Sequence, residues 1–320
     1  MTSSDVLHRP LTCAGAVESV KISVSMQTRL IINADDFGSS RAVNSAVLKS
    51  HERGVLTAAS LMVTGDASDE AIEIARTHPE LAVGLHLTLT MGRSVLPSKE
   101  IPSIVDDRSH FTSNPAAAGF KYFFSASARR QLKSEIEAQF EAFAKTGLPF
   151  SHVDGHQHLH VHPAIFPTVI DLCRRYRIPG VRIPREPLGA NLRIDRSGLA
   201  DKLIVSFGHR LMSDTALRSV GRSDIAVCDA VVGGMMSGRM SEEYVTGILS
   251  KTHGESLEVF FHPADSECED YEKDRFGPNS DDLRTLLSPT FKAFLLDRGY
   301  ELSNYRKLSC DFTEEIRATD

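Results

Sequence analysis

Two adjacent aspartates are the first residues of this chain with the chemistry of a catalytic site. Asp35 and Asp36 directly follow an apolar run at residues 30–34. From an extended backbone their side chains point different ways, so one carboxylate can bind a metal while the other accepts a proton. An Asx turn followed by a helix N-cap explains the same dipeptide equally well. The pair alone therefore leaves both interpretations open.

A histidine-rich tract is the strongest local signal. From His152 to His162, every second residue is His or Asp. In an extended strand all six side chains would lie on one face, and neutral imidazole is the commonest metal ligand. We expect Gly155 to end the strand, so that one or two of the six reach a metal while the others support it or contact substrate. A tract that binds metal adventitiously is the alternative.

Three further polar residues lie in or after apolar runs. His86 and Arg182 lie within such runs, and His262 directly follows another. Each alone is typical of a hydrogen-bonded core or loop residue. Because the carboxyl ends of parallel strands form the reaction face of α/β sheets and barrels, together they predict a shared site. One Asp and two His would form an open metal site, with a second carboxylate as base and a distal histidine as acid, which fits amide or ester hydrolysis.

The elements that must position these residues alternate between strand and helix patterns from residue 29 onward. Strands are predicted at 30–34, 56–63, 81–87, 181–183 and 257–261, with others beginning at 152 and near 301–305. Helices are predicted at 41–53, 67–77, 127–146, 164–177, 241–252 and 281–298. Such alternation predicts a parallel sheet, open or closed. Residues 90–119 are typical of a long functional loop, and residues 185–222 give no clear pattern.

Composition excludes several classes of protein. The chain has 320 residues, of which 41% are hydrophobic and 24% charged, close to the averages of globular proteins. Its net charge of −6, without a run of five like charges, argues against a nucleic-acid partner. No stretch approaches about 18 apolar residues, so we expect no transmembrane segment. We expect a disordered N-terminal extension at 1–28, one domain at 29–310 and a polar C-terminal tail at 311–320.

The cysteine pattern indicates which cellular compartment the protein suits. The five are scattered and form no C-x-x-C pair, so neither a disulfide framework nor a thiolate zinc site is indicated. This usage suits a reducing compartment. We therefore expect a cytoplasmic protein, with peripheral association with the inner membrane as an alternative.

Five segments together resemble the YdjC-like carbohydrate deacetylases. They are IINADDFG at 31–38, VGLHL at 83–87, HVDGHQHLH at 152–160, VRIPRE at 181–186 and FHPA at 261–264. The resemblance runs in this order from about residue 29 to about residue 308. It implies an α/β fold, namely an irregular, TIM-barrel-like (β/α)-barrel in a single domain.

The resemblance also implies roles for individual residues. Asp36, His86 and His156 would bind one divalent metal ion, Zn²⁺ or Mg²⁺, Asp35 would be the general base, His262 the acid, and His158 and Arg182 contacts to the substrate or oxyanion. Two imidazoles and one carboxylate suit zinc, whereas magnesium prefers oxygen ligands. The Gly-His-Gln-His sequence at 155–158 departs from the Ser-His-His-His of the chitooligosaccharide enzymes, which keeps the ligand and changes its neighbours.

The substrate implied is an amino sugar. The chain resembles most the family members associated with hopanoid biosynthesis, which implies removal of an N-acetyl group from an N-acetylglucosamine unit on a hopanoid glycolipid. A soluble chito-oligosaccharide is the alternative substrate, and a non-catalytic metal- or carbohydrate-binding protein is the alternative from another class. The fold class also allows a homodimer. We expect the Tyr122-Phe123-Phe124 triplet in the core, with an apolar groove for a lipid-linked sugar or a dimer contact as alternatives.

Overall fold

The computed structural model describes residues 27–195, 199–221, 224–271 and 280–310. Most of the expected N-terminal extension and the whole expected tail lie outside the described residues. Those two assignments and the domain boundaries at 29 and 310 therefore stay predictions. In the part of the chain that the structure describes, no helix is both long and apolar enough to cross a bilayer.

Within the described residues, eight strands form one parallel sheet. They are β1 (Arg29–Phe37), β2 (Ala58–Leu61), β3 (Ala82–Leu87), β4 (His152–Gly155), β5 (Gly180–Val181), β6 (Ala230–Val232), β7 (Ser256–Phe261) and β8 (Glu301–Ser303). Seven follow the order β5-β4-β3-β2-β1-β7-β6, and β8 pairs with the first residues of β1. Nearly every strand residue is buried, as expected for parallel strands covered by helices.

The sheet curls into an irregular barrel. A parallel bridge joins Gly180 of β5 to Ala226, which precedes β6. The N–H of Val181 donates to the Ala226 carbonyl at 3.0 Å, and the N–H of Ala226 donates to the Pro179 carbonyl at 2.7 Å. These bonds bring the two ends of the strand order together. The predicted irregular (β/α)-barrel is thereby confirmed.

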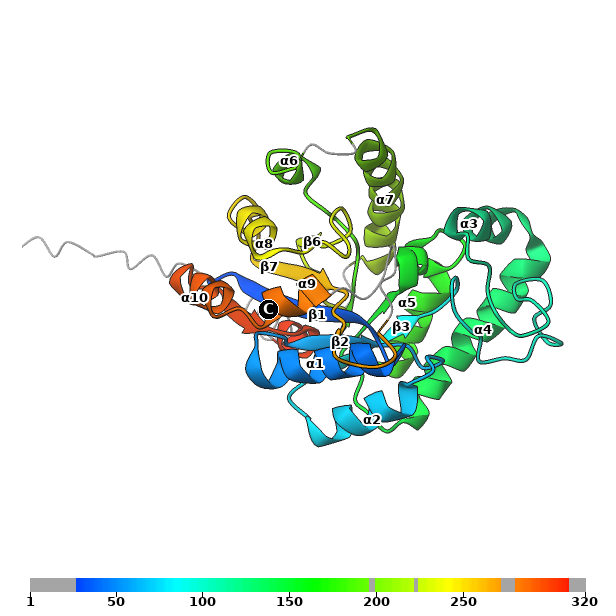
Figure 1. The fold of residues 1–320 in the computed structure, drawn as a ribbon. Coiled ribbons are helices and arrows are strands. Elements are labelled where there is room, and N and C mark those ends of the chain that lie inside the picture. Colours follow the sequence, from blue (N-terminus) through cyan, green and yellow to red (C-terminus); the bar gives the residue numbers. More distant parts are fainter. Residues whose placement is uncertain (1–26, 196–198, 222–223, 272–279, 311–320) are drawn as a thin grey trace, which may run out of the picture.

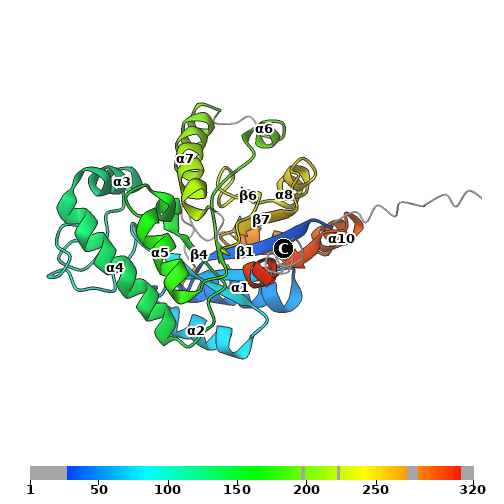
Figure 2. The ribbon, with the colours of Figure 1, turned by 180° about the vertical axis from the view of Figure 1, so that it is seen from behind.

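Helices surround the strands in both views of the molecule (Figures 1 and 2). They are α1 (Arg41–Arg53), α2 (Ser68–Thr77), α3 (Pro115–Phe124), α4 (Ala126–Lys145), the short 3₁₀ helix η1 (His156–Val161), α5 (Phe166–Tyr176), α6 (Leu188–Asn191), α7 (Leu199–Val220), α8 (Glu242–Leu249), α9 (Ser280–Leu286) and α10 (Pro289–Asp297). Serine caps begin several of them. The Ser40 hydroxyl accepts from the N–H of Val43 in α1, and that of Ser125 accepts from Ala128 in α4.

The long helix α4 illustrates how spacing predicts packing. Leu132, Ile136, Phe140 and Phe143 recur at intervals of four, four and three, and all four side chains are buried. The Phe143 ring stacks on Phe150, with 4.2 Å between ring centroids.

Several expected elements differ from the structure. β1 continues past residue 34 to Phe37, because the N–H of Met62 donates to the Phe37 carbonyl at 2.8 Å after a shift in register. The single helix expected at 281–298 is two helices, since Pro289 lacks an N–H and begins α10. The expected loop at 90–119 ends at Pro115, where α3 begins. The region 185–222, which had no clear pattern, contains α6 and α7.

The aromatic triplet divides between core and surface. Tyr122 is buried and its hydroxyl donates to the Leu89 carbonyl at 2.7 Å. Phe123 and Phe124 are exposed, so the expectation that the triplet lies in the core is wrong for both. A ten-residue helix packed on one side can bury only its inner face.

Candidate metal centre and active site

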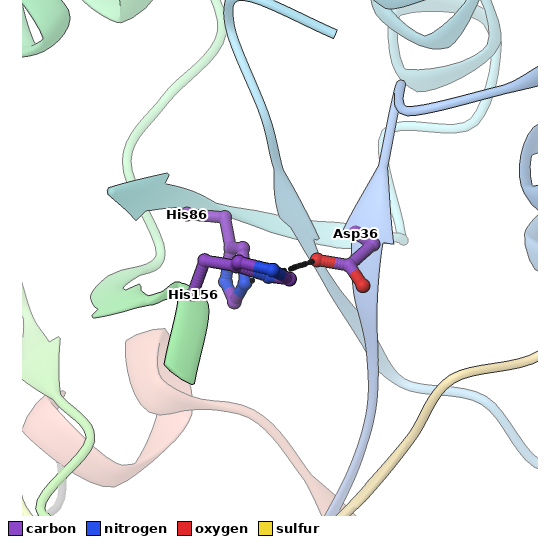
Figure 3. Close-up of side chains that lie close together, drawn as sticks. All are labelled: Asp36, His86 and His156. Carbon is purple, nitrogen blue, oxygen red and sulfur yellow. Dashed lines mark hydrogen bonds and ion pairs between the residues drawn. The ribbon is translucent and has the colours of Figure 1, made fainter. Parts of the chain in front are cut away.

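The ends of β1, β3 and β4 bring three metal-ligand side chains together. Asp36, His86 and His156 each offer one atom, and these atoms lie within 4.8 Å of one another. The Asp36 Oδ1 atom is 2.9 Å from Nδ1 of His156 and 3.2 Å from Nε2 of His86. Both imidazole rings point toward the Asp36 carboxylate (Figure 3). The three side chains named by the family resemblance therefore form one group.

Left-handed backbone conformations occur at Asp36 and directly after His156. Asp36, Gln157 and His158 have φ angles of 62°, 55° and 56°, a region that costs a non-glycine residue roughly 1–3 kcal/mol. The turn at Asp36 coincides with the register shift in β1, so the two adjacent aspartates face different surroundings. Gly155 is the last residue of β4, as expected, and the alternation of the histidine tract is lost where η1 begins.

The surroundings of His86 fit a bound cation. Its Nδ1 lies 2.7 Å from Oδ1 of Asp154, whereas its buried Nε2 makes no hydrogen bond even though Asp36 is close. A proton assigned to Nδ1 leaves the Nε2 lone pair facing a carboxylate, an arrangement that a cation between them would stabilise. A carboxylate that orients an imidazole in this way is common at metal sites. The donors fit a divalent ion.

The pKa values of His86 and Asp36 also indicate that this group favours positive charge. Burial lowers the pKa of His86, but the carboxylates of Asp154, Asp36 and Asp35 outweigh that effect and raise it well above its usual value. The pKa of Asp36 shows the opposite shift: burial raises it, and His156 and His86 hold it well below its usual range. The carboxylates around His86 therefore favour positive charge at this ring, and a bound divalent ion would supply such charge.

Arg182 is fully buried and pairs with three carboxylates. Its Nη1 and Nη2 atoms hold both oxygens of Asp35, at 2.7 and 2.8 Å. Nη1 is also 2.8 Å from Oδ2 of Asp154, and Nη2 is 2.7 Å from Oε1 of Glu258. Burial lowers the pKa of Arg182, yet these carboxylates raise it well above its usual value. The expected substrate contact is absent from this arrangement, because the Arg182 side chain has no exposed surface.

Negative charge exceeds positive charge around this arginine. Asp35, Asp154 and Glu258 pair with its one guanidinium, and a fourth buried carboxylate, Asp36, lies beside His86 and His156. Burial raises the pKa of Glu258, and the Tyr305 hydroxyl donates to its Oε2 at 2.6 Å. Because buried charges need partners, the excess of carboxylates is a second feature that favours a bound cation.

Asp35 lies next to the metal group and keeps one oxygen partly available. Its Oδ1 accepts from Asn33 and Arg182, both at 2.8 Å, whereas Oδ2 accepts from Arg182 alone at 2.7 Å. A carboxylate oxygen has two lone pairs, so Oδ2 retains one. Asp35, His86 and Asp154 also form a compact group, but both of these carboxylates already bind Arg182. The group around Asp36 is therefore the better metal site.

His262 follows β7 beside the end of β1. Ala34 and Phe261 are paired in the sheet, so the next residues along the two strands are Asp35 and His262. The His262 Nδ1 lies 3.2 Å from Oγ of Ser237, and its backbone N–H donates to Asp282 at 2.9 Å. Barrel topology thus brings the expected acid and the expected base to neighbouring strand ends.

His158 lies toward a cavity rather than in the metal group. The cavity has a volume of about 980 Å³, and its lining includes His158, Phe260, Met235 and Glu186. The His158 ring packs edge-on against Phe260, with 5.3 Å between centroids. A pocket of this size can hold a small organic ligand.

Two other histidines of the tract, His152 and His160, support the interior. His152 Nε2 lies 3.0 Å from Oγ of Ser60, which in turn donates to Asp154 at 2.8 Å, and His160 Nε2 lies 2.7 Å from the Arg182 carbonyl. Burial lowers the pKa of His152 and of His160 to about 4, so both rings are neutral at pH 7. Of the six alternating residues, only His156 joins the metal group.

Two residues of the interior network were missed in the sequence. Asn33 and Glu258 are the polar residues in the otherwise apolar strand sequences LIINA and LEVFF. A buried charge in an apolar strand indicates a specific partner, and this signal was available. Asp154 was noted as part of the tract, but without its role in orienting His86.

Comparisons with known proteins identify the family of this chain. The family model described as YdjC-like protein matches residues 29–297. A carbohydrate deacetylase of Geobacillus stearothermophilus is 31% identical over 87% of this chain and 96% of its own length, and a chitooligosaccharide deacetylase of Serratia marcescens is 27% identical over 88% and 100%. A crystal structure from Enterococcus faecalis V583, provisionally described as a cellobiose-phosphate cleavage protein, is 26% identical, covers 88% of this chain and 99% of its own, and superposes with a TM-score of 0.68. This chain belongs to the YdjC-like family.

Proposed function

We propose that the protein is a metal-dependent deacetylase that removes the N-acetyl group from an N-acetylglucosamine unit carried on a hopanoid glycolipid. The observation that carries the proposal is the group of Asp36, His86 and His156, with a second carboxylate, Asp35, directly beside it. The names of the two full-length relatives support the reaction class. The hopanoid carrier rests on the sequence resemblance alone.

Asp36, His86 and His156 would hold the metal, with zinc favoured by two imidazole donors. When bound, a divalent ion polarises the amide carbonyl and lowers the pKa of a coordinated water. Asp154 holds the His86 ring at 2.7 Å, so the ring nitrogen that faces Asp36 is fixed before the metal arrives. Such preorganisation reduces the cost of assembling the site.

Asp35 and His262 would move the protons. Oδ2 of Asp35 has the spare lone pair and would accept the proton of the attacking water, while the two-point contact with Arg182 fixes the direction of that oxygen. Arg182 is thus a positioning residue and not a contact to the oxyanion. His262 would donate a proton to the departing amine from the neighbouring strand end.

The cavity at His158 would receive the part of the substrate beyond the N-acetyl group. Its lining combines apolar side chains such as Phe260 and Met235 with the carboxylate of Glu186. Such a mixed surface suits a sugar attached to an apolar carrier.

A soluble chito-oligosaccharide is the second candidate substrate. It is favoured by the similarity to the Serratia marcescens chitooligosaccharide deacetylase along that protein's full length. The test is to measure acetate released from diacetylchitobiose and from N-acetylglucosaminyl-hopanoid. Acetate from the glycolipid is the expected result, and turnover of diacetylchitobiose alone would replace the hopanoid carrier with the soluble sugar.

A variant separates catalysis from metal binding. Asp35→Asn removes the base but none of the proposed ligands, so we expect acetate release to fall by about 10²–10⁴-fold. Metal content, measured by plasma mass spectrometry, should stay unchanged. Asp171→Asn, on the exposed side of α5, is the matched control and should keep full activity.

Two results would contradict this assignment. Unchanged turnover in Asp35→Asn would remove Asp35 as the base. Stoichiometric metal without acetate from either substrate would favour a non-catalytic binding protein.

A further inference from the structure

Three phenylalanines of α3 form an exposed apolar face, which we call the phenylalanine face. Phe120, Phe123 and Phe124 expose 68%, 51% and 66% of their surface. Among the side chains that the structure describes, no other phenylalanine is exposed. Their spacing of three and four residues puts them on one side of the helix. The rings are also in contact, with centroids 4.5 Å apart for Phe120 and Phe124 and 5.0 Å for Phe123 and Phe124.

The opposite side of α3 is firmly held. Ala118 and Tyr122 are buried, and the Tyr122 hydroxyl is bonded to Leu89. Asn114 caps the helix by accepting from the N–H of Ala117 at 3.0 Å. The helix therefore has a fixed orientation, and its outer face is the phenylalanine face. A contiguous exposed aromatic cluster of this kind marks an interaction surface.

Exposed cations lie on α3 and in the sequence on either side of it. From residue 108 to residue 134 the sequence contains Arg108, Lys121, Arg129, Arg130 and Lys133, and no Asp or Glu. All five side chains are exposed. Arg129 donates to the Phe123 carbonyl, which places one of these cations beside the rings. The whole chain has a net charge of −6, so this local excess is opposite in sign to the rest of the protein.

We propose that α3 and the first turns of α4 form a peripheral docking surface for bilayers that contain anionic lipid. The three rings would enter the boundary between headgroups and acyl chains, and the surrounding cations would contact lipid phosphates. A ten-residue helix is about 15 Å long, too short to cross the roughly 30 Å hydrocarbon core. The helix would therefore lie in the membrane surface.

The position of α3 relates this surface to the metal group. α3 packs against η1, whose first residue is His156. The Phe123 ring meets His162, just beyond η1, with 6.1 Å between centroids. In both ribbon views α3 lies at the periphery of the molecule, next to α4 and further from the sheet than α5 (Figures 1 and 2). Docking through α3 would bring the chain segment that supplies a metal ligand near the bilayer.

The charges argue against a second copy of this chain as the occupant. In a two-fold symmetric contact the same patch meets itself. Lys121 and Arg129, which lie beside the rings, would then face their own copies across the interface, and like charges at close range disfavour association. An anionic bilayer is complementary to both the rings and the cations.

The test measures vesicle binding by the full chain, so it does not depend on the proposed reaction. Vesicles of phosphatidylcholine alone and with 30% phosphatidylglycerol are sedimented with the protein at low and at 0.5 M salt. We expect binding to the anionic vesicles that weakens with salt. Replacing Phe120, Phe123 and Phe124 together with alanine should lower the partition coefficient by about tenfold or more. Leu296→Ala, at a 70% exposed leucine of α10, is the matched control and should bind normally.

A fluorescence reporter gives an independent reading. The chain contains no tryptophan, so Phe124→Trp introduces a single probe whose emission should shift to the blue when anionic vesicles are added. Replacing Lys121, Arg129 and Arg130 with glutamine should weaken binding and flatten its salt dependence. Circular dichroism melting curves establish that each variant is folded.

Two results would overturn the proposal. One is the absence of both sedimentation and a blue shift in the folded protein. The other is a dimer, measured by light scattering, that the triple alanine variant converts to monomer without any change in vesicle binding.

Discussion

Replacing Arg182 with methionine should destabilise the protein strongly. The change removes the guanidinium that pairs with Asp35, Asp154 and Glu258 and keeps most of the buried volume. Breaking a buried ion pair by removing one partner costs roughly 3–5 kcal/mol, because the charges that remain lose their compensation. We therefore expect the free energy of unfolding at pH 7 to fall by about that amount.

The destabilisation should also depend on pH, and it should grow as the pH rises. Burial already raises the pKa of Glu258, and Arg182 is the largest influence that lowers it. In Arg182→Met the folded-state pKa of Glu258 rises further above its unfolded value of about 4.3. Above pH 4.3 the unfolded chain loses this proton while the folded variant keeps it. Its stability should therefore decrease by about 1.4 kcal/mol per pH unit up to the folded pKa.

Urea unfolding between pH 5 and pH 8, in the presence of chelator, measures both effects. The difference between wild type and variant should be largest at neutral pH and shrink toward pH 5. Arg174→Met removes an exposed arginine that lies 3.6 Å from Asp171, and this control should change stability by no more than about 0.5 kcal/mol. A loss below 1 kcal/mol, or a difference that does not vary with pH, would refute the assignment of Arg182 as the counter-charge of the interior.

Three further outcomes follow from the same contacts. Asp154→Asn should lower divalent-metal affinity by about 10–100-fold in a competition titration with a chromophoric chelator, because His86 loses its orienting carboxylate. Removing metal should lower the melting temperature, and re-adding zinc at 100 times its dissociation constant should restore about 2.7 kcal/mol by calorimetry; equal melting curves would argue against a site in the folded state. Gly84→Ala should cost about 1–3 kcal/mol in urea unfolding, since a Cβ there would lie 2.5 Å from the His152 ring.

The elements with regular patterns could be predicted closely from sequence. The predicted bounds of α1 are those observed, and those of α4 differ by one residue at each end. Both helices have a capping serine and a periodic buried face, which are local signals. β6 was missed because three residues are too few for any periodicity, and the sheet holds them through pairing with β7.

The candidate site was predictable to the extent that it depends on strand ends. Asp36, His86 and His156 lie at the ends of β1, β3 and β4, and parallel topology brings such ends to one face. Contacts across the barrel interior had no such signal. Arg182 follows β5 and Glu258 lies in β7, and these strands are far apart in the strand order. The two residues meet because the sheet curves until its two ends come together.

The burial of Arg182 and the exposure of the phenylalanine face both depart from the usual preference of the residue type. Arginine is usually exposed, because removing its charge from water costs free energy. Phenylalanine is usually buried, because exposing its apolar ring to water costs free energy. Arg182 is buried because three carboxylates replace its hydration, and Phe124 is exposed because no other described residue covers the outer side of α3. Both departures cost free energy in the isolated fold. Such costs persist at functional positions, so the interior charges and the exposed rings are the features most worth testing in this protein.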